Sequence, residues 1–277
     1  MGMSDDTQIR RQVAATLRAA LKEDQFVLYR QAIAPLGRAA TDAGYQEILV
    51  RFLEEEQKLL APGAFIPELE ELNLMQHLDH WVVNRLLKWI YETRAARPGL
   101  AVPRSSVNLS ANTLRDPGFG DWVRAQITDW AAPADSLSFE VGESVAAAER
   151  APLRALAAVL APLGVQVAVS GFLGTRESFE VARDLGAKII KLAGGLGANV
   201  HRDASACVKV KMISDRCRAT GVRTVAERVE EQAALQKLRE IGVDYAQGFG
   251  IGRPVPLVVG KVGAPRGDGE LAWLTAA

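Results

Sequence analysis

No stretch of this chain approaches the ~20 consecutive apolar residues that a membrane-spanning helix requires. The first residues, MGMSDDTQIRRQ, are charged and contain no apolar signal-peptide core. A surplus of one charge is also missing, because 33 Lys and Arg residues balance 33 Asp and Glu residues. The balance argues against a nucleic-acid polymer or an anionic membrane as a partner, although local basic residues can still meet a small anion.

Cysteine is scarce as well. The two cysteines, Cys207 and Cys217, fall in one segment with helical periodicity. At a rise of about 1.5 Å per residue they lie ~15 Å apart along that helix, which is too far for a disulfide. We therefore expect a reducing, cytoplasmic setting. With 48% hydrophobic residues, the chain is able to bury a large core in one domain.

Short β-branched runs alternate with longer segments of helical periodicity. The predicted strands are 26–33, 45–52, 104–109, 136–141, 165–170, 187–192, 222–228 and 244–249. The predicted helices are 66–95 (as two helices), 114–130, 146–162, 176–185, 203–219 and 230–241. This order predicts an α/β fold, a modified TIM (β/α)₈ barrel. Residues 34–44 are too few for a crossover helix, so the first two strands should form an antiparallel pair.

The ends of the chain differ in character from its middle. Residues 1–25 predict an amphipathic leader helix, with Val13, Leu17 and Leu21 on its apolar side. Residues 26–259 hold the strand and helix pattern, and the Gly- and Pro-rich residues 260–277 predict a flexible tail. Glycines follow four of the helical segments, where left-handed C-caps are expected, at Gly164, Gly186, Gly221 and Gly242.

Isolated polar residues punctuate six of the strand candidates. They are Glu47, Asn108, Glu140, Lys191, Glu227 and Gln247. Strand ends converge on one face of such a barrel, so these side chains should meet in one pocket. Glu and Asn oxygens suit magnesium or manganese, and lysine suits a phosphate. The run VQVAVSGF breaks the series, because it carries Ser170 and Gly171 where a carboxylate would complete the set.

Other motifs carry weaker chemistry. His77 and His80 are spaced for one face of a helix, but no cysteine or third histidine accompanies them, which favours solvated helix residues over a zinc site. Gly194-Gly195-Leu196-Gly197 lacks the context of a phosphate loop and is interpreted as a flexible connection.

Motifs surround the six polar positions in a fixed order. Glu47-Ile48-Leu49-Val50-Arg51 corresponds to Glu-Ala-Leu-x-Arg, and Asn108-Leu109-Ser110 to Asn-Leu-Ser. The others are Tyr29 to Ile33, Phe65 to Met75, Asp79 to Val82, Glu140 to Glu143, Ile190-Lys191, Ala226 to Glu230, Gln247 to Phe249 and Arg253-Pro254. Over residues 10–257 the chain thereby resembles the EAL domain, a bacterial signalling module that hydrolyses cyclic di-GMP.

The resemblance implies a two-metal hydrolysis of a phosphodiester. It implies a set of metal ligands, namely Glu47, Asn108, Glu140 and Glu227, with Lys191 orienting water or phosphate. The nucleotide site that it implies comprises Gln31, Leu49, Arg51, Asn108, Lys191, Glu230, Gln247 and Pro254.

One departure affects the reaction itself. The family's Asp-Asp-Phe-Gly motif should supply the carboxylates shared by the two ions, and here it reads Ser170-Gly171-Phe172-Leu173. No shift of register restores the pair, because Val165 to Thr175 contains no Asp or Glu. At most one Mg²⁺ or Mn²⁺ is then expected, no cofactor is required for binding, and hydrolysis should be negligible. In the loop that the family uses to link metal binding to dimerisation, Arg176 and Glu177 instead predict a helix start.

Three functions stay open at this point. The chain can be an inactive receptor for cyclic di-GMP, a nucleotide-independent scaffold for a signalling protein, or a weak metal-dependent phosphodiesterase. Retention of Arg51, Asn108, Lys191 and Gln247 favours the receptor, and a homodimer is compatible with each function. Altered positions at Ala32, Gly142 and Ala193 count against nucleotide binding.

Overall fold

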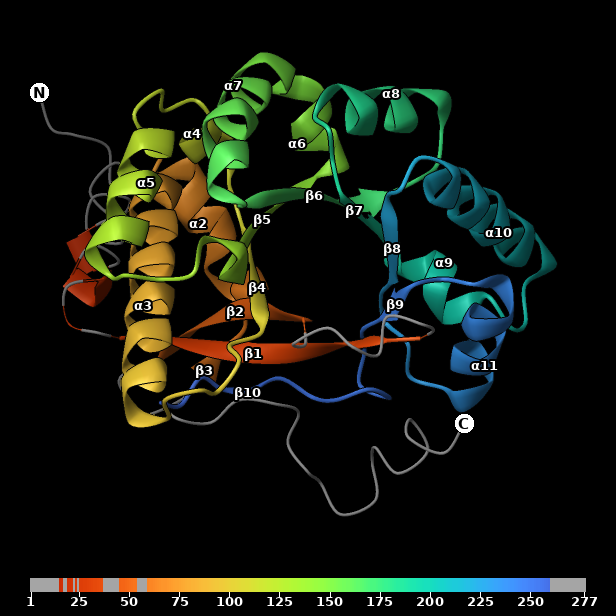
Figure 1. Cartoon of the computed structure of the whole chain (residues 1–277), viewed down its shortest axis with the longest axis horizontal. Helices are drawn as coiled ribbons and strands as arrows, with labels where there is room; N and C mark the ends of the chain where they lie inside the picture. The colour runs from red at the N-terminus through yellow and green to blue at the C-terminus, as the bar shows by residue number, and fades with distance from the viewer. Residues whose placement is uncertain are drawn as a thin grey trace, which may run out of the picture.

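The computed structural model describes residues 15–16, 19–21, 23, 25–36, 45–53 and 59–259. All eight predicted strands form: β1 (Phe26–Pro35), β2 (Tyr45–Leu53), β4 (Arg104–Asn108), β5 (Leu137–Gly142), β6 (Gln166–Phe172), β7 (Ile189–Leu192), β8 (Arg223–Ala226) and β9 (Tyr245–Ala246). They pair in the order β1-β9-β8-β7-β6-β5-β4-β2, and pairing of β1 with β2 closes the barrel (Figure 1). Two short strands, β3 (Leu59–Leu60) and β10 (Val255–Pro256), extend the sheet.

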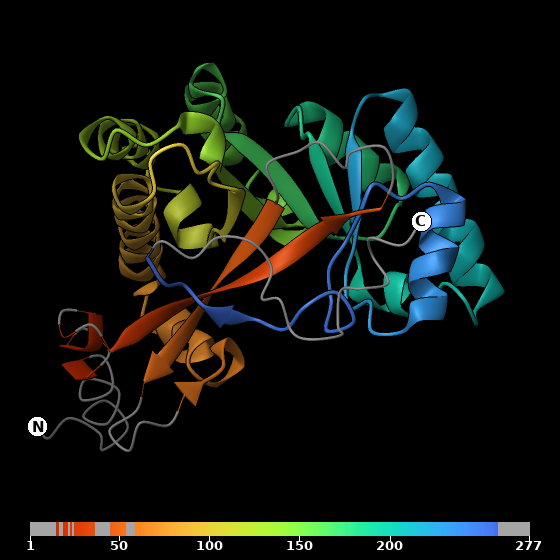
Figure 2. The ribbon, with the colours of Figure 1, turned by 60° about the horizontal axis from the view of Figure 1, so that its bottom comes forward.

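Strand β1 runs against its neighbours. It is antiparallel to both β2 and β9, whereas every pairing from β2 through β4 to β9 is parallel. The predicted antiparallel pair is therefore confirmed. The register places Gln31 opposite Glu47, so residues from both strands reach the same level of the barrel. Figure 2 shows β1 crossing in front of the other strands, with β10 beside it.

Helices surround the strands on the outside (Figure 1). They are α2 (Ile66–Glu71), α3 (Met75–Ala96), α4 (Ala111–Leu114), α5 (Phe119–Asp129), α6 (Glu143–Ala148), α7 (Arg150–Leu160), α8 (Arg176–Asp184), α9 (Gly194–Asn199), α10 (Ala204–Ala219) and α11 (Gln232–Ile241). Short 3₁₀ helices cover Pro62–Ala64, Ala134–Ser136 and Ala161–Leu163. Region 66–95 contains two helices as predicted. Regions 114–130 and 146–162 are each interrupted, at Pro117-Gly118 and at Glu149.

The interpretation of Gly194 to Gly197 as a flexible connection is wrong, because these residues begin α9. Glycines are poor helix formers, but here they permit a close approach. A β-carbon on Gly197 would lie 2.7 Å from the Glu227 carbonyl oxygen. The helix is therefore set directly against the end of β8.

Several local predictions agree with the structure. Gly164, Gly186, Gly221 and Gly242 all have positive φ angles after helices. Thr175 caps α8 through a reciprocal hydrogen-bond pair with Ser178, so the predicted helix start at Arg176 is confirmed. Both cysteines lie on α10 and are free thiols.

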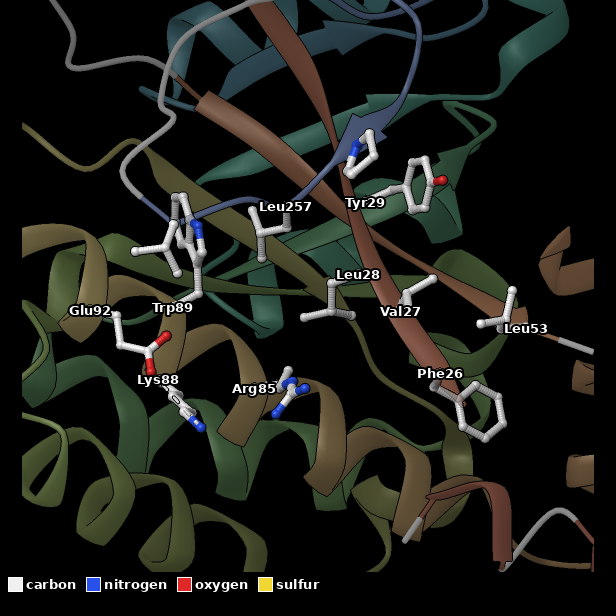
Figure 3. A pocket seen from close by; sticks show the side chains of 12 residues that line it. Phe26, Val27, Leu28, Tyr29, Leu53, Arg85, Lys88, Trp89, Glu92 and Leu257 are labelled. Carbon is white, nitrogen blue, oxygen red and sulfur yellow. Dashed lines mark ion pairs between the residues drawn. The ribbon is translucent and has the colours of Figure 1, made fainter. Parts of the chain in front are cut away.

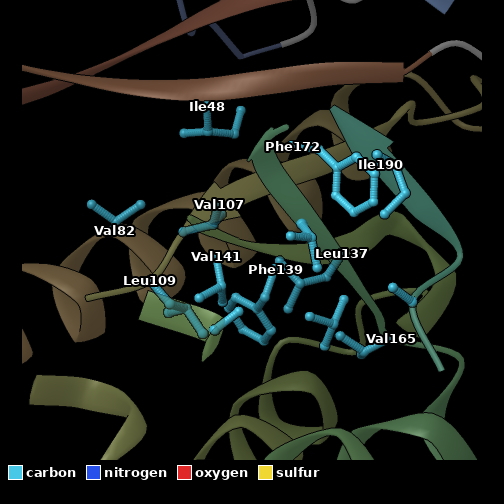
Figure 4. Packing of buried hydrophobic residues seen from close by; sticks show 14 of the residues in the cluster. Ile48, Val82, Val107, Leu109, Leu137, Phe139, Val141, Val165, Phe172 and Ile190 are labelled. Carbon is cyan, nitrogen blue, oxygen red and sulfur yellow. The ribbon is translucent and has the colours of Figure 1, made fainter. Parts of the chain in front are cut away.

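The hydrophobic core has two parts. The larger part lies between the sheet and the helices, where Val82 of α3 faces Ile48 and Val107 (Figure 4). The smaller part draws one residue each from β1, β2, β6, β7, β8 and β9, and so occupies the inside of the barrel: Ile33, Tyr45, Ala168, Ile189, Val225 and Tyr245. The remaining inward positions of the strands are free to carry polar chemistry.

A groove of about 610 Å³ lies between β1, α3 and the segment after β10. Figure 3 shows apolar side chains such as Tyr29 and Leu257 on one side, with Lys88 and Glu92 of α3 at the rim. The Trp89 indole donates a hydrogen bond to the Val258 carbonyl (2.9 Å) and closes one end.

Residues 15–16 and 19–21 are helical. The rest of the predicted leader helix, including Val13 and Leu17, lies outside the described residues, as does the tail from residue 260. Within the described part of the chain, no helix combines the length and apolar character required to cross a membrane.

Candidate functional site

Lys191 lies at the centre of a buried carboxylate cluster. Its side chain is 0% exposed, and its Nζ contacts one oxygen of Glu47 at 2.8 Å and both oxygens of Glu140 at 3.0 and 2.9 Å. The Glu227 carboxylate completes the set at 3.0 Å. These residues come from β2, β5, β7 and the first position after β8, so closure of the barrel is what brings them together.

Amide side chains hold Glu47 from the other directions. Asn108 at the end of β4 donates to its Oε1 (2.9 Å), and Gln247 after β9 donates to its Oε2 (2.8 Å). Gln247 also donates to Gln31 of β1 (3.0 Å), which in turn donates to the Gly252 carbonyl (2.9 Å). All six polar residues that the sequence placed at strand ends therefore belong to one network.

The pKa values of two carboxyls in the cluster, Glu47 and Glu140, shift in opposite directions. Burial disfavours ionised Glu47, but Lys191 and the hydrogen bonds to this carboxylate outweigh burial and hold its pKa below the usual value. Burial raises the pKa of Glu140 to about 7; Lys191 opposes this rise, while the charges of Glu47 and Glu227 add to it. Burial also disfavours the Lys191 ammonium, yet the three carboxylates raise its pKa well above the usual value. The lysine is thus a permanent cation of the site.

The donor set fits one hard divalent cation. One oxygen from each of Glu47, Glu140 and Glu227 lies within 4.8 Å of the others, and the Asn108 side chain lies beside them, with its amide nitrogen donating to Glu47. Oxygen ligands of this kind suit Mg²⁺ or Mn²⁺. Within the described residues no other group of three His, Cys, Asp or Glu side chains is close enough to hold an ion. His80 instead packs 4.2 Å from the Trp122 ring, and His77 is exposed.

The end of β6 brings no carboxylate to this face. Ser170 pairs in register with Gly142 of β5, and the ladder to β7 is irregular between Val169 and Phe172. Gly171 has a φ of 65°, in the left-handed region. Ser170 and Gly171 line a cavity of about 430 Å³ between β5, β6 and α8.

Glu143 fixes the segment that follows β6. Its carboxylate accepts hydrogen bonds from the Leu173 backbone N–H (2.7 Å) and from the Ser178 hydroxyl (2.8 Å). One side chain at the start of α6 thus ties down both ends of the β6–α8 loop.

The other predicted nucleotide residues lie around the network with different exposures. Leu49, Arg51 and Pro254 are half-buried, and Arg51 rests over the Tyr29 ring, 5.6 Å from its centroid. Arg51 donates to the carbonyl of Val50 at 2.8 Å. Glu230 is exposed, and the group of three clustered glutamates does not include it.

Two supporting residues were not predicted. The Ser106 hydroxyl donates to Glu140 (3.3 Å), and its position two residues before Asn108 on the same strand face is a signal that could have found it. Buried Asp79 of α3 accepts hydrogen bonds from the Ser110 N–H and hydroxyl and from Thr113, at 2.6–2.9 Å. Burial raises the pKa of Asp79, and these bonds oppose the rise. Asp79 thereby orders the chain just after Asn108.

The fold is a closed, modified TIM barrel with one reversed strand, and it carries a lysine-centred acidic cluster at the carboxyl ends of its strands. The chain belongs to the EAL domain family, whose pattern it matches over residues 14–254. It is similar to the cyclic di-GMP phosphodiesterase PdeB of Shewanella oneidensis, with 32% identity over 244 residues. The match covers 88% of this chain and 28% of PdeB, so the chain spans well under half of that relative.

Solved EAL structures share the fold. The EAL domain of Xanthomonas citri FimX in complex with c-diGMP superposes with a TM-score of 0.83 at 23% identity, covering 91% of this chain and 96% of that domain. The phosphodiesterase PaMucR in its c-di-GMP complex gives a TM-score of 0.77 at 26% identity, covering 88% of this chain and 98% of the chain in that structure. This family thus includes phosphodiesterases and domains seen with cyclic di-GMP bound.

Proposed function

We propose that this EAL domain is a receptor for cyclic di-GMP that does not hydrolyse it. The observation that carries the proposal is the contrast between an intact Glu47–Asn108–Lys191–Gln247 network and a β6 end that offers no carboxylate. Binding residues persist, while the groups expected to bridge two ions are missing.

The charge balance supports binding of a doubly anionic dinucleotide. Lys191 is surrounded by three carboxylates, and the raised pKa of Glu140 makes this group easily protonated near neutral pH. One divalent ion, held by Glu47, Asn108, Glu140 and Glu227, would offset the remaining negative charge beside a phosphate. Arg51 and Gln31, with Leu49, Glu230 and Pro254, form the proposed nucleotide side of the pocket.

The lack of hydrolysis follows from what a two-metal site requires. Two divalent ions ~3.5–4 Å apart repel each other, and bridging anions hold them together. Ser170 supplies one neutral oxygen and Gly171 supplies none. Without a second ion, no group at the β6 end activates water or stabilises the leaving oxygen.

Titration calorimetry with cyclic di-GMP, with and without Mg²⁺, tests binding, and chromatography of the products with Mn²⁺ tests hydrolysis. We expect heat of binding and no linear dinucleotide. Arg51→Ala should weaken binding by about tenfold or more, since a charge-assisted contact is lost. Arg124→Ala, on the outer surface of α5, is the matched control and should bind as the parent does.

Two outcomes would contradict the proposal in different ways. Absence of heat on titration with cyclic di-GMP at high protein concentration would exclude the receptor function and favour the nucleotide-independent scaffold. Linear product that disappears in Glu47→Ala would show a metal-dependent phosphodiesterase instead.

A further inference from the structure

A charged cavity lies at the end of the barrel opposite the acidic cluster. Its volume is about 560 Å³, and it is lined by residues at or next to the starts of β2, β4, β6, β7, β8 and β9. Its floor contains Tyr45 and Tyr245, whose ring centroids are 6.1 Å apart. A volume of this size is typical of small-molecule sites.

Cations dominate the lining of this cavity. Among the described lining residues, four cationic side chains accompany one carboxylate, that of Asp135, although the chain as a whole has no net charge. The cations are Arg94 at the end of α3, Arg104 of β4, Lys188 before β7 and Arg223 of β8. Such a segregation of charge focuses an attractive field for anions within the cavity.

Neutral acceptors position two of the arginines without cancelling their charge. Arg94 donates to the Ala131 carbonyl (2.8 Å), and Arg104 donates to the Asp135 carbonyl (2.9 Å) and the Gln166 amide oxygen (2.8 Å). Arg223, by contrast, pairs with Asp244 at 2.8 Å. Across the described residues, Arg94, Arg104 and Lys188 form no ion pair with a carboxylate.

We propose that this cavity, the amino-terminal pocket, binds a small molecule that carries phosphate groups. Preordered guanidinium groups offer forked donors that match phosphate oxygens, and Lys188 adds a mobile point charge. Tyr45, Ile189 and Tyr245 of the inner hydrophobic layer line the pocket, and this layer separates it from the Lys191 cluster.

The test is a titration of the whole chain with inorganic pyrophosphate at low salt, followed by calorimetry. We expect saturable binding that weakens by about tenfold or more in the double variant Arg94→Gln and Lys188→Gln. Both side chains are exposed, so the fold should be preserved, which the thermal unfolding midpoint checks. Arg124→Gln with Lys237→Gln removes the same charge from α5 and α11 and should leave binding within about twofold.

A third variant separates the two ends of the barrel. Asn108→Ala should retain pyrophosphate binding, because Asn108 lies in the other mouth. The proposal is overturned if no saturable binding occurs, if the pocket and control double variants lose affinity equally, or if Asn108→Ala abolishes it.

Discussion

The two ends of the barrel treat charge in opposite ways: the carboxyl mouth holds the Lys191 cluster, and the amino mouth holds the amino-terminal pocket. Glu47 is two residues beyond Tyr45 on β2, and Lys191 is two residues beyond Ile189 on β7, so each pair faces inward at different depths. At the carboxyl mouth the charges are buried and paired with one another. At the amino mouth they are exposed or half-buried, and Arg94 and Arg104 are held by neutral carbonyls.

This difference shows that burial decides whether a charged side chain must have a partner of opposite charge. A buried ion must be paired, which makes the carboxyl mouth sensitive to the loss of any single member. An exposed arginine or lysine is hydrated and can remain unpaired until an anion arrives. A substitution in the buried cluster at the carboxyl mouth should therefore lower stability strongly, whereas a substitution of an exposed charge at the amino mouth should change stability little.

The largest expected effect comes from removing the central cation. Lys191→Met would leave three carboxylates facing one another without a cation, and we expect the free energy of unfolding to fall by about 3–5 kcal/mol. Urea denaturation measures this loss. Lys188→Met, three residues earlier at the amino mouth, is the control and should change stability by about 0.5 kcal/mol or less. If both variants lose the same free energy of unfolding, the proposed difference between buried and exposed charges is wrong.

The next effect should come from adding the missing carboxylates. Ser170→Asp with Gly171→Asp is expected to raise Mn²⁺-dependent hydrolysis of cyclic di-GMP by about 100-fold over background, because a second ion can then be bridged. A β-carbon at Gly171 meets no atom within 4 Å, and Asp tolerates positive φ better than most residues. Product formation is followed by chromatography.

The control for this gain is Ser170→Asn with Gly171→Asn, which has nearly the same shape without the charge. If both double variants stay inactive while the Asp variant binds metal, the β6 end is not the cause of inactivity.

A smaller effect concerns pH. The folded-state pKa of Glu140 is about 7, above the usual value of 4.5. Between pH 4.5 and 7, Glu140 is therefore mostly protonated in the folded chain and mostly ionised in the unfolded chain. The stability that Glu140 contributes is therefore fully present below about pH 4.5 and is lost as pH rises through 7. Between pH 5 and 7 we expect a fall of about 2 kcal/mol in the free energy of unfolding.

Denaturation across this pH range compares the parent with Glu140→Gln, which should lack most of the fall. Glu240→Gln, on exposed α11, should keep it. If the free energy of unfolding of Glu140→Gln falls with pH as steeply as that of the parent, another group is responsible for the pH dependence.

The sequence predicts the strands well because their β-branched runs and glycine C-caps are local signals. It also predicts that six polar residues meet, because strand ends in such a barrel share one face. The central position of Lys191 was not predictable, since it depends on the register and closure of strands distant in sequence. Helix α9 was missed because its glycines have low helix propensity and are explained by their contact with Glu227.

The reversal of β1 has a topological consequence. In a regular TIM barrel the chain enters at the amino ends of the strands, away from the functional face. Here Phe26 pairs with Phe52 beyond Glu47, so the chain enters the barrel at the functional face. Residues 255–256 then return to pair with Tyr29 and Arg30 on the same half of β1. Mechanical movement carried by the chain ahead of residue 26 would thus arrive beside Arg51 and the carboxylates without crossing the barrel.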